Sequence, residues 1–135
     1  MLKIGDLLGG KYRILSVVGR GGMSTVYLAC NERANKNWAV KEVRKSGVNQ
    51  DQVVEQSLLT EVEIMKHLNN PHLPSIIDVI DIDDTFVIVM DFVEGNSLEK
   101  VLEHGSVSEI QVIDLAKQLC DVLLYLHSCN PPIIY

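Results

Sequence analysis

The chain has 135 residues, which is enough for one domain with a buried core and too few for two ordinary domains. Hydrophobic residues make up 47% of it and charged residues 22%, which indicates a globular protein rather than a disordered one. The formal net charge of −6 argues against a surface for nucleic acid, so we expect no nucleic-acid partner. A small bound nucleotide is compatible with this charge because it needs only local positive charge.

The three cysteines are scattered along the chain without a CxxC pair; they are Cys30, Cys120 and Cys129. We expect reduced thiols in a cytoplasmic protein, and neither a disulfide framework nor a metal site. No apolar run approaches the length of a membrane span, and Lys3, Gly5 and Asp6 interrupt the region where a signal peptide would need an apolar stretch. We therefore expect no membrane segment in this chain, and leave open an anchor elsewhere in a longer parent protein.

Short apolar runs alternate with turn residues at the start of the chain, which predicts three strands, at 11–19, 25–31 and 37–44. A glycine-rich loop over 19–24 joins the first two strands. The polar segment 31–36 suits a hairpin turn between the second and the third. Strands that follow one another so closely in sequence are expected to pair antiparallel.

A long amphipathic helix is predicted over residues 51–68. Its apolar positions recur every three or four residues and form one stripe, made of Val54, Leu58, Val62, Met65 and Leu68. Two further strands are expected at 75–82 and 85–92. The order of three strands, a helix and two strands predicts the α+β class, with a five-stranded antiparallel sheet packed by one helix.

Two more helices are expected in the rest of the chain, a short one ending near residue 105 and a long one ending near residue 127. Asn96 with Glu99, and Ser106 with Glu109, have the spacing of capping boxes at the two N-termini. The short helix is separated from the last strand by a glycine, which suits a connection between domains.

The long final helix is apolar over most of its circumference. Its polar positions form one narrow stripe, made of Gln111, Asp114, Gln118, Asp121 and Tyr125. A helix of this kind belongs inside a larger domain. We therefore divide the chain into a sheet-containing domain at 1–93 and the start of an incomplete helical domain at 94–135.

The glycine-rich loop is the first feature that points to chemistry. Gly19, Gly21 and Gly22 lack Cβ atoms, so main-chain N–H groups can approach phosphate oxygens without a steric conflict. Glycines mark ordinary hairpins more often than phosphate sites, so the loop alone is weak evidence. A Walker-type loop and a dinucleotide-binding loop are both excluded, because each opens a helix and a strand follows here.

Lys41 is the second candidate. Alternation along its strand puts Lys41 on one face with Ala39 and Val43, where an unpaired ammonium would be costly if that face is buried. The lysine could instead lie on an edge strand and extend to water, which is the more common situation. Glu61, beside the apolar stripe of the long helix, could pair with Lys41, although glutamates on helices are usually surface residues.

Together these segments are far more specific than any one of them. The loop GRGGMSTV at 19–26, the triplet AVK ending at Lys41, the helix with Glu61 and the segment VMDFVEG at 89–95 resemble the small lobe of eukaryotic-like protein kinases. The resemblance covers nearly the whole chain, and the GxGGMxxV form of the loop is most similar to bacterial serine/threonine kinases. The final segment, LLYLHSCNPPIIY, resembles the stretch that leads into the catalytic loop of that family.

The resemblance implies that the loop covers the phosphates of ATP, through Val18, Gly19, Arg20, Gly21, Gly22, Met23 and Ser24. Val26 and Ala39 would sandwich the adenine, and Lys41 would hold the α- and β-phosphates while paired with Glu61. Ser24 stands where the general pattern has a third glycine, and its Cβ narrows the permitted backbone of the loop.

The resemblance also implies roles for the segment after the last strand. Met90 would be the gatekeeper behind the adenine. The carbonyl of Asp91 and the N–H of Val93 would bind the adenine edge. Ser97 lies near the position of a ribose contact, and it could equally be a helix cap.

By this resemblance the parent protein transfers the γ-phosphoryl group of ATP to serine and threonine hydroxyls of proteins. The catalytic aspartate and the ligands of Mg²⁺ are expected beyond residue 135, so we expect no catalytic and no metal-binding residue in this truncated kinase domain. We predict that the chain alone is inactive and binds ATP weakly. The alternatives are a pseudokinase that acts as a scaffold, and self-association of the chain, as a homodimer or a domain swap, through its apolar helix.

Overall fold

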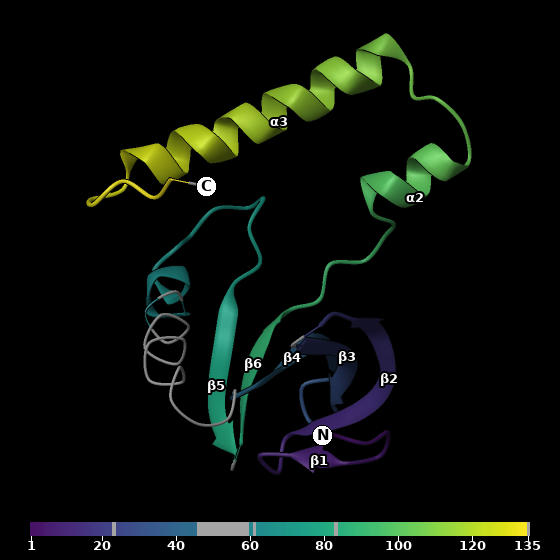
Figure 1. Cartoon of the computed structure of the whole chain (residues 1–135), viewed down its shortest axis with the longest axis vertical. Helices are drawn as coiled ribbons and strands as arrows, with labels where there is room; N and C mark the ends of the chain where they lie inside the picture. The colour runs from purple at the N-terminus through teal and green to yellow at the C-terminus, as the bar shows by residue number, and fades with distance from the viewer. Residues whose placement is uncertain (23, 46–59, 61, 83, 135) are drawn as a thin grey trace. The chain divides into compact units, whose positions relative to one another are not determined.

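The computed structural model describes residues 1–22, 24–45, 60, 62–82 and 84–134 (Figure 1). The chain divides into two compact units. The first comprises Met1–Leu68 and Pro74–Val93, and the second comprises Asn69–Leu73 and Glu94–Tyr135. Each unit has its own architecture.

Within its described residues, the first unit contains an antiparallel sheet of six strands in the order β1-β2-β3-β4-β6-β5 (Figure 1). The strands are β1 Leu7–Leu8, β2 Tyr12–Arg20, β3 Ser24–Asn31, β4 Lys36–Arg44, β5 Ile76–Ile82 and β6 Thr85–Asp91. The five predicted strands are all present, with boundaries that agree to within one residue, and the predicted antiparallel pairing is confirmed. β1 is present in addition to the five predicted strands. The sequence does not predict it, because two residues are too few to show an alternating pattern.

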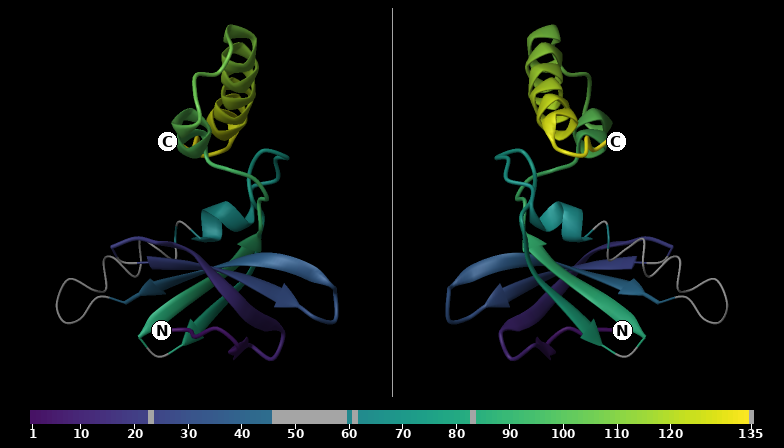
Figure 2. Two further views of the ribbon diagram at one scale, coloured as in Figure 1. Left: turned by 90° about the vertical axis from the view of Figure 1, so that its right-hand side faces the viewer. Right: turned by 90° about the vertical axis from the view of Figure 1, so that its left-hand side faces the viewer.

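Alternating side chains of β2, β3, β4 and β6 form a core on one face of the sheet. Its largest fully buried members are Ile14, Tyr27, Val40, Val87 and Val89. Leu8 from β1 and Trp38 from β4 belong to the same cluster. Removing each such side chain from water contributes roughly 1.5–3 kcal/mol, so this core is what holds the strands in register. Figure 2 shows the twist of the strands relative to one another, which has the physical cause common to all sheets of L-residues.

The helix predicted over 51–68 falls mostly outside the described residues. Within the described part, residue 60 and residues 62–66 are helical. Val62 is buried, and Met65 and Leu68 are half-buried, whereas Glu63 is exposed. The described positions therefore agree with the predicted apolar stripe.

The second unit contains the two predicted helices, and the first of them has a different N-cap from the one predicted. α2 is Leu98–Glu103, and its N-cap is Ser97 rather than Asn96. The Ser97 hydroxyl accepts a hydrogen bond from the Lys100 N–H at 3.2 Å. This choice still leaves Glu99 in the first turn, where the helix dipole favours a carboxylate. Ser97 thus has the capping role that the sequence left open for it.

The second helix, α3 Glu109–Ser128, also begins with a different cap. The capping box is formed by Ser108 and Gln111 rather than by Ser106 and Glu109. The Gln111 side chain accepts from the Ser108 N–H at 2.9 Å. Both pairs have the same spacing, so the sequence does not distinguish them, and the observed pair places Glu109 in the favourable first turn.

α3 exposes many apolar side chains. They include Ile110, Val112, Ile113, Leu119, Leu123 and Leu124. By contrast, Leu126 near the end of the helix is buried. The apolar character predicted for this helix therefore lies largely on its surface. Even so, none of the described helices is both long and apolar enough to cross a membrane.

A buried carboxylate fixes the start of the chain to the sheet. Glu42 in β4 is only 3% exposed, and both of its oxygens accept from the Leu2 N–H, at 3.1 and 3.2 Å. The Tyr27 hydroxyl donates to the same carboxylate at 2.9 Å. Burial and this hydrogen bond raise the pKa of Tyr27, which keeps its proton in place as a donor. The pairing of these groups is what makes a buried charge tolerable here.

We predict that Glu42→Ala lowers the free energy of unfolding by about 2–3 kcal/mol, because the half-buried Leu2 N–H and the buried Tyr27 hydroxyl both lose their acceptor. Urea unfolding followed by the fluorescence of Trp38, the single tryptophan of the chain and a member of the core, measures this change. Glu103→Ala, which removes an exposed carboxylate of α2, is the control and is expected to have little effect. Equal stability of the wild type and Glu42→Ala would contradict the prediction.

Candidate functional site

Strand register brings four of the proposed site residues onto one face of the sheet. Val26 in β3 lies opposite Lys41 in β4, and Lys41 lies opposite Ile88 in β6. In the next row, Ala39 lies opposite Met90. Side chains that are directly opposite in antiparallel strands share a face, and alternate positions of one strand share it too. Val26, Ala39, Lys41 and Met90 therefore form one surface, which we call the Lys41 face.

The Lys41 face is the side of the sheet opposite to the core. The neighbours of Lys41 along β4, Val40 and Glu42, are both buried on the other side, whereas Lys41 itself is half-buried. None of the described residues forms an ion pair with the Lys41 ammonium. The expected partner, Glu61, lies outside the described residues, so the Lys41–Glu61 pair stays a prediction.

The glycine-rich segment forms the turn between β2 and β3, in which the Gly21 N–H donates to the Ser24 carbonyl at 2.8 Å. None of its glycines has a positive φ, so the backbone conformation does not require them. No described atom lies within 4 Å of a Cβ added at Gly19 or Gly22. Neither a positive φ nor close packing among the described residues requires glycine at Gly19 or Gly22, so the main chain there is open to close approach.

The remaining described positions of the glycine-rich loop show no feature that points to a ligand. Val18 and Arg20 are exposed at the end of β2. Met23 lies outside the described residues. Ser24 begins β3 with an ordinary φ, so the missing third glycine imposes no strain on the described backbone.

A cavity of about 150 Å³ lies beside this loop. It is lined by Met1, Arg20, Gly21, Gly22, Ser24, Thr25, Glu42 and Arg44. Thr25 lies opposite Glu42 in the sheet, so the cavity is on the face that carries Glu42 and not on the Lys41 face. It is also smaller than the roughly 300 Å³ at which ligand pockets usually begin. For both reasons we do not assign the phosphate site to this cavity.

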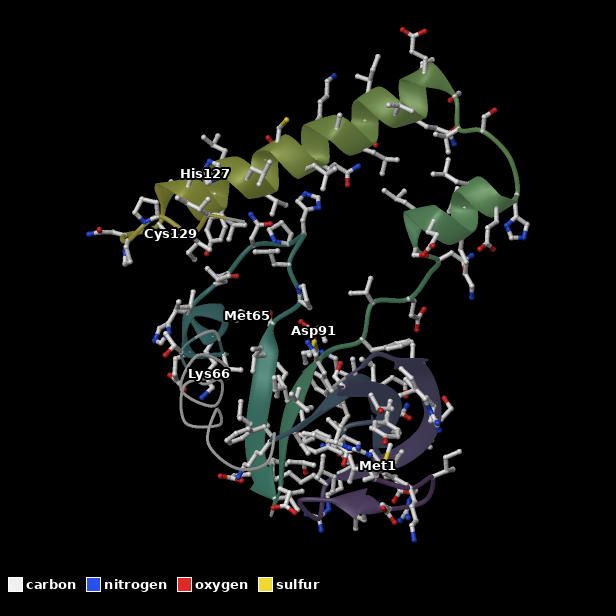
Figure 3. All side chains as sticks on the ribbon, in the orientation of Figure 1. Met1, Met65, Lys66, Asp91, His127 and Cys129 are labelled. Carbon is white, nitrogen blue, oxygen red and sulfur yellow. The ribbon has the colours of Figure 1, made fainter. Side chains whose placement is uncertain are left out.

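The end of β6 forms the border of the Lys41 face. The Asp91 N–H donates to the Ser75 carbonyl at 3.0 Å, and the Ser75 N–H donates to the Asp91 carboxylate at 3.1 Å. The Lys36 ammonium lies 3.3 Å from the other carboxylate oxygen. Figure 3 shows Asp91 where the β6 ribbon ends. Val93, two residues later, is 73% exposed.

The chain is similar to known proteins over most of its length. The protein kinase domain family matches residues 12–135, which is nearly the whole chain. The chain belongs to the protein kinase family. The α+β fold with a kinase-type small lobe, expected from the sequence, is thereby confirmed.

Individual protein kinases support the same conclusion. Myosin light chain kinase A of Dictyostelium discoideum is 33% identical over 120 residues, which are 88% of this chain and 40% of that protein. Serine/threonine-protein kinase PrkC of Bacillus subtilis is 30% identical over 125 residues, 92% of this chain and 19% of PrkC. The probable serine/threonine-protein kinase YbdM of the same bacterium is 29% identical over 128 residues, 93% of this chain and 50% of YbdM.

The chain thus spans half or less of the length of these kinases. The expected resemblance to bacterial serine/threonine kinases is confirmed by the two relatives from Bacillus subtilis.

Sequence reasoning on this kinase chain missed one group of contacts. It assigned Asp91 a role through the main chain only, and it did not identify Lys36 or Ser75 at all. Lys36 is one of several polar residues in a hairpin segment, and Ser75 stands at the start of a strand, so no spacing or motif marks either of them. Only the pairing of β4, β5 and β6 brings the three residues together.

The environment of Asp91 favours its ionised form. The hydrogen bond from the Ser75 N–H lowers the pKa of Asp91 below its usual value, and the Lys36 ammonium acts in the same direction against the opposing effect of burial. The charge of the carboxylate is therefore stabilised in the folded protein more than in the unfolded chain. The side chain is about a third exposed, so solvent screens part of this effect.

We predict that Asp91 stabilises the fold at neutral pH and that this contribution disappears in acid. Because the folded-state pKa is lowered, the contribution is fully present above the unfolded value of about 3.9 and is lost as pH falls through the folded value. Urea unfolding of the wild type and Asp91→Asn, from about pH 7 to about pH 2.5, should show a stability difference that shrinks at the acid end. Asp84→Asn, which changes an exposed residue of the β5–β6 turn, serves as the control. A difference that does not vary with pH would contradict the prediction.

Proposed function

We propose that this chain is the ATP-binding part of a protein serine/threonine kinase, which transfers the γ-phosphoryl group of ATP to serine and threonine hydroxyls of proteins. The observation that carries the proposal is the Lys41 face, where a half-buried lysine shares a surface with three apolar residues beside a glycine turn. This combination has the two components that ATP needs. A cation can hold phosphates, and an apolar surface can pack against adenine.

Each residue of the site has a proposed role. The turn containing Gly19, Gly21 and Gly22 would cover the phosphates with main-chain N–H groups. Lys41 would bind the α- and β-phosphates, and Glu61 would orient it from the long helix.

The adenine would pack between the apolar side chains of Val26 and Ala39, with Met90 behind it. The Asp91 carbonyl and the Val93 N–H would bind its edge. We accordingly propose residues 1–93 as the ATP-binding lobe and 94–135 as the start of a helical lobe.

Phosphoryl transfer also needs Mg²⁺ and an aspartate that orients the acceptor hydroxyl. We propose that these ligands and this aspartate lie beyond residue 135, so that the chain by itself binds ATP weakly and transfers nothing. A scaffolding role without catalysis would need neither the lysine nor the open glycine turn, and nothing in the described residues favours it. A cytoplasmic location is the corresponding proposal, since ATP is available there and Cys30, Cys120 and Cys129 are all free thiols.

The test is Lys41→Met, which removes the phosphate-binding charge and keeps much of the side-chain length. In a complete kinase domain that begins with this chain, phosphorylation of a protein substrate should fall by at least about a hundred-fold. In the chain alone, calorimetric titration with ATP should show weaker binding. Lys11→Met is the matched control, because Lys11 is an exposed lysine of the same unit that lies near Asp78. Undiminished activity and ATP affinity in Lys41→Met would refute the proposed function.

We further propose that the 135-residue chain self-associates with a second copy through the apolar surface of α3. The exposed side chains of Ile110, Ile113 and Leu124 favour this, since large uncovered apolar surfaces drive association.

We predict that light scattering coupled to size exclusion gives about twice the chain mass of 15.1 kDa. Replacing both Ile110 and Leu124 by Glu should give the monomer mass, because two charges cannot be buried without partners. Leu119→Glu, the same kind of change at an exposed position on the opposite side of the helix, should leave the dimer intact. A monomeric wild type would contradict this proposal without affecting the assignment of ATP binding.

A further inference from the structure

Asp91 joins three segments of the first unit that are far apart in the sequence. Its carboxylate accepts from the N–H of Ser75, the residue before β5, and lies 3.3 Å from the Lys36 ammonium at the start of β4. We call Asp91, Ser75 and Lys36 the Asp91 latch. All three residues belong to one compact unit, and Figure 3 labels Asp91 at the end of β6.

The two hydrogen bonds between Asp91 and Ser75 are reciprocal. The Asp91 N–H donates to the Ser75 carbonyl at 3.0 Å, and the Ser75 N–H donates back to the Asp91 side chain at 3.1 Å. An ionised carboxylate is a stronger acceptor for an N–H group than a neutral carbonyl. Regular pairing of β5 with β6 stops at Ile76. The Asp91 side chain therefore adds one more hydrogen bond, to Ser75, just beyond the last regular pair.

Lys36 holds the carboxylate from the other side. Its ammonium lies 4.0 Å from the ring centroid of Trp38, a buried core residue that is directly opposite Asp91 between β4 and β6. The lysine side chain is 54% exposed, so the ion pair adds little to stability by itself. Its position over a fixed aromatic ring gives the carboxylate a defined orientation.

The Asp91 latch lies on the core side of the sheet, opposite to the Lys41 face. Alternation puts the Asp91 side chain on the same face as Trp38, whereas the neighbouring Met90 is on the face of Ala39 and Lys41. The carboxylate is consequently directed away from the proposed adenine position, and its connection to that position is the main chain of residues 91–93.

We propose that Asp91 is a positioning residue for adenine: its carboxylate, held by Ser75 and Lys36, fixes the main chain at the end of β6 so that the groups of Asp91 and Val93 are aligned with the adenine edge. This inference rests on the proposed function. The chain leaves the first unit directly after Val93 and re-enters it at Pro74, next to Ser75. Two of the three connections to the second unit, at Pro74 and at Val93, therefore start within two residues of the latch, where an unfixed main chain would have freedom to move.

The experiment compares adenosine and ATP as ligands of the wild-type chain, Asp91→Ala and Asp91→Asn, by calorimetric titration. Adenosine has no phosphates, so its affinity reports on the adenine edge without the glycine turn or Lys41. Asp91→Ala removes the acceptor of the Ser75 N–H and should weaken adenosine binding on the order of three- to ten-fold. Asp91→Asn retains an acceptor oxygen of the same shape, and it should restore most of the affinity.

Asp78 supplies a matched control in the same sheet. Its carboxylate also accepts from a main-chain N–H, that of Val79 at 3.0 Å, and lies 3.9 Å from the ammonium of Lys11. Asp78→Ala thus removes the same kind of interaction away from residues 91–93. It should lower thermal stability and leave adenosine affinity within about two-fold of the wild type, in contrast to Asp91→Ala.

The outcomes separate the inference from the proposed function. If Asp91→Ala binds adenosine as tightly as the wild type does, the positioning role is refuted and ATP binding stands. If Asp78→Ala and Asp91→Ala lose affinity equally, the effect is one of general stability and the positioning role is again refuted. If the wild type binds neither adenosine nor ATP, the proposed function itself fails. A loss that is specific to Asp91→Ala and is recovered in Asp91→Asn supports the latch.

Discussion

The register of β3, β4 and β6 is the constraint on which the rest of this structure depends. Side chains alternate along β4, so Lys41 and Val40 are forced onto opposite faces. A slip of one residue would turn the ammonium into the core and expose a fully buried valine, at a cost that no local contact could offset. The apolar packing of Val40 against Tyr27 and Val89, its partners in the ladder, therefore fixes where Lys41 stands.

Polar contacts on the core side complete this arrangement at both ends of β4. Near one end Glu42, buried on the core face, accepts from Leu2 and Tyr27, which ties the start of the chain to the sheet. At the other end, Lys36 pairs with Asp91 beside the last residues of β6. Carboxylates thus secure the sheet from the side opposite to the proposed nucleotide. Lys41 itself takes part in none of the ion pairs formed among the described residues.

The helices of the second unit are stabilised locally by capping, whereas the sheet of the first unit is stabilised by a buried core. α2 and α3 are fixed locally by the caps Ser97 and Ser108, which satisfy N–H groups of their first turns. Most of the apolar surface of α3 is nevertheless exposed, and capping cannot compensate for apolar area left in water. A helix of this composition derives its stability from packing, which is consistent with a chain that spans half or less of its kinase relatives.

The sequence by itself determined the elements and the family. Alternation located five strands to within one residue, and the combination of the glycine turn, Lys41 and the segment from 89 to 95 identified a protein kinase lobe. It failed at both helix caps, because consecutive polar residues offer equivalent spacings and a small difference in local geometry decides between them.

Only the tertiary structure decided how side chains from distant segments meet. No pattern in the sequence predicts a role for Glu42, and for Asp91 the sequence predicts a role of its main chain alone. Strand pairing brought Glu42 to Tyr27 and Asp91 to Ser75, which are 15 and 16 residues apart in the chain. Periodicity in a sequence reports which face a residue occupies, since it follows from local backbone geometry. It contains no information on which strands become neighbours, because that depends on packing of the whole core.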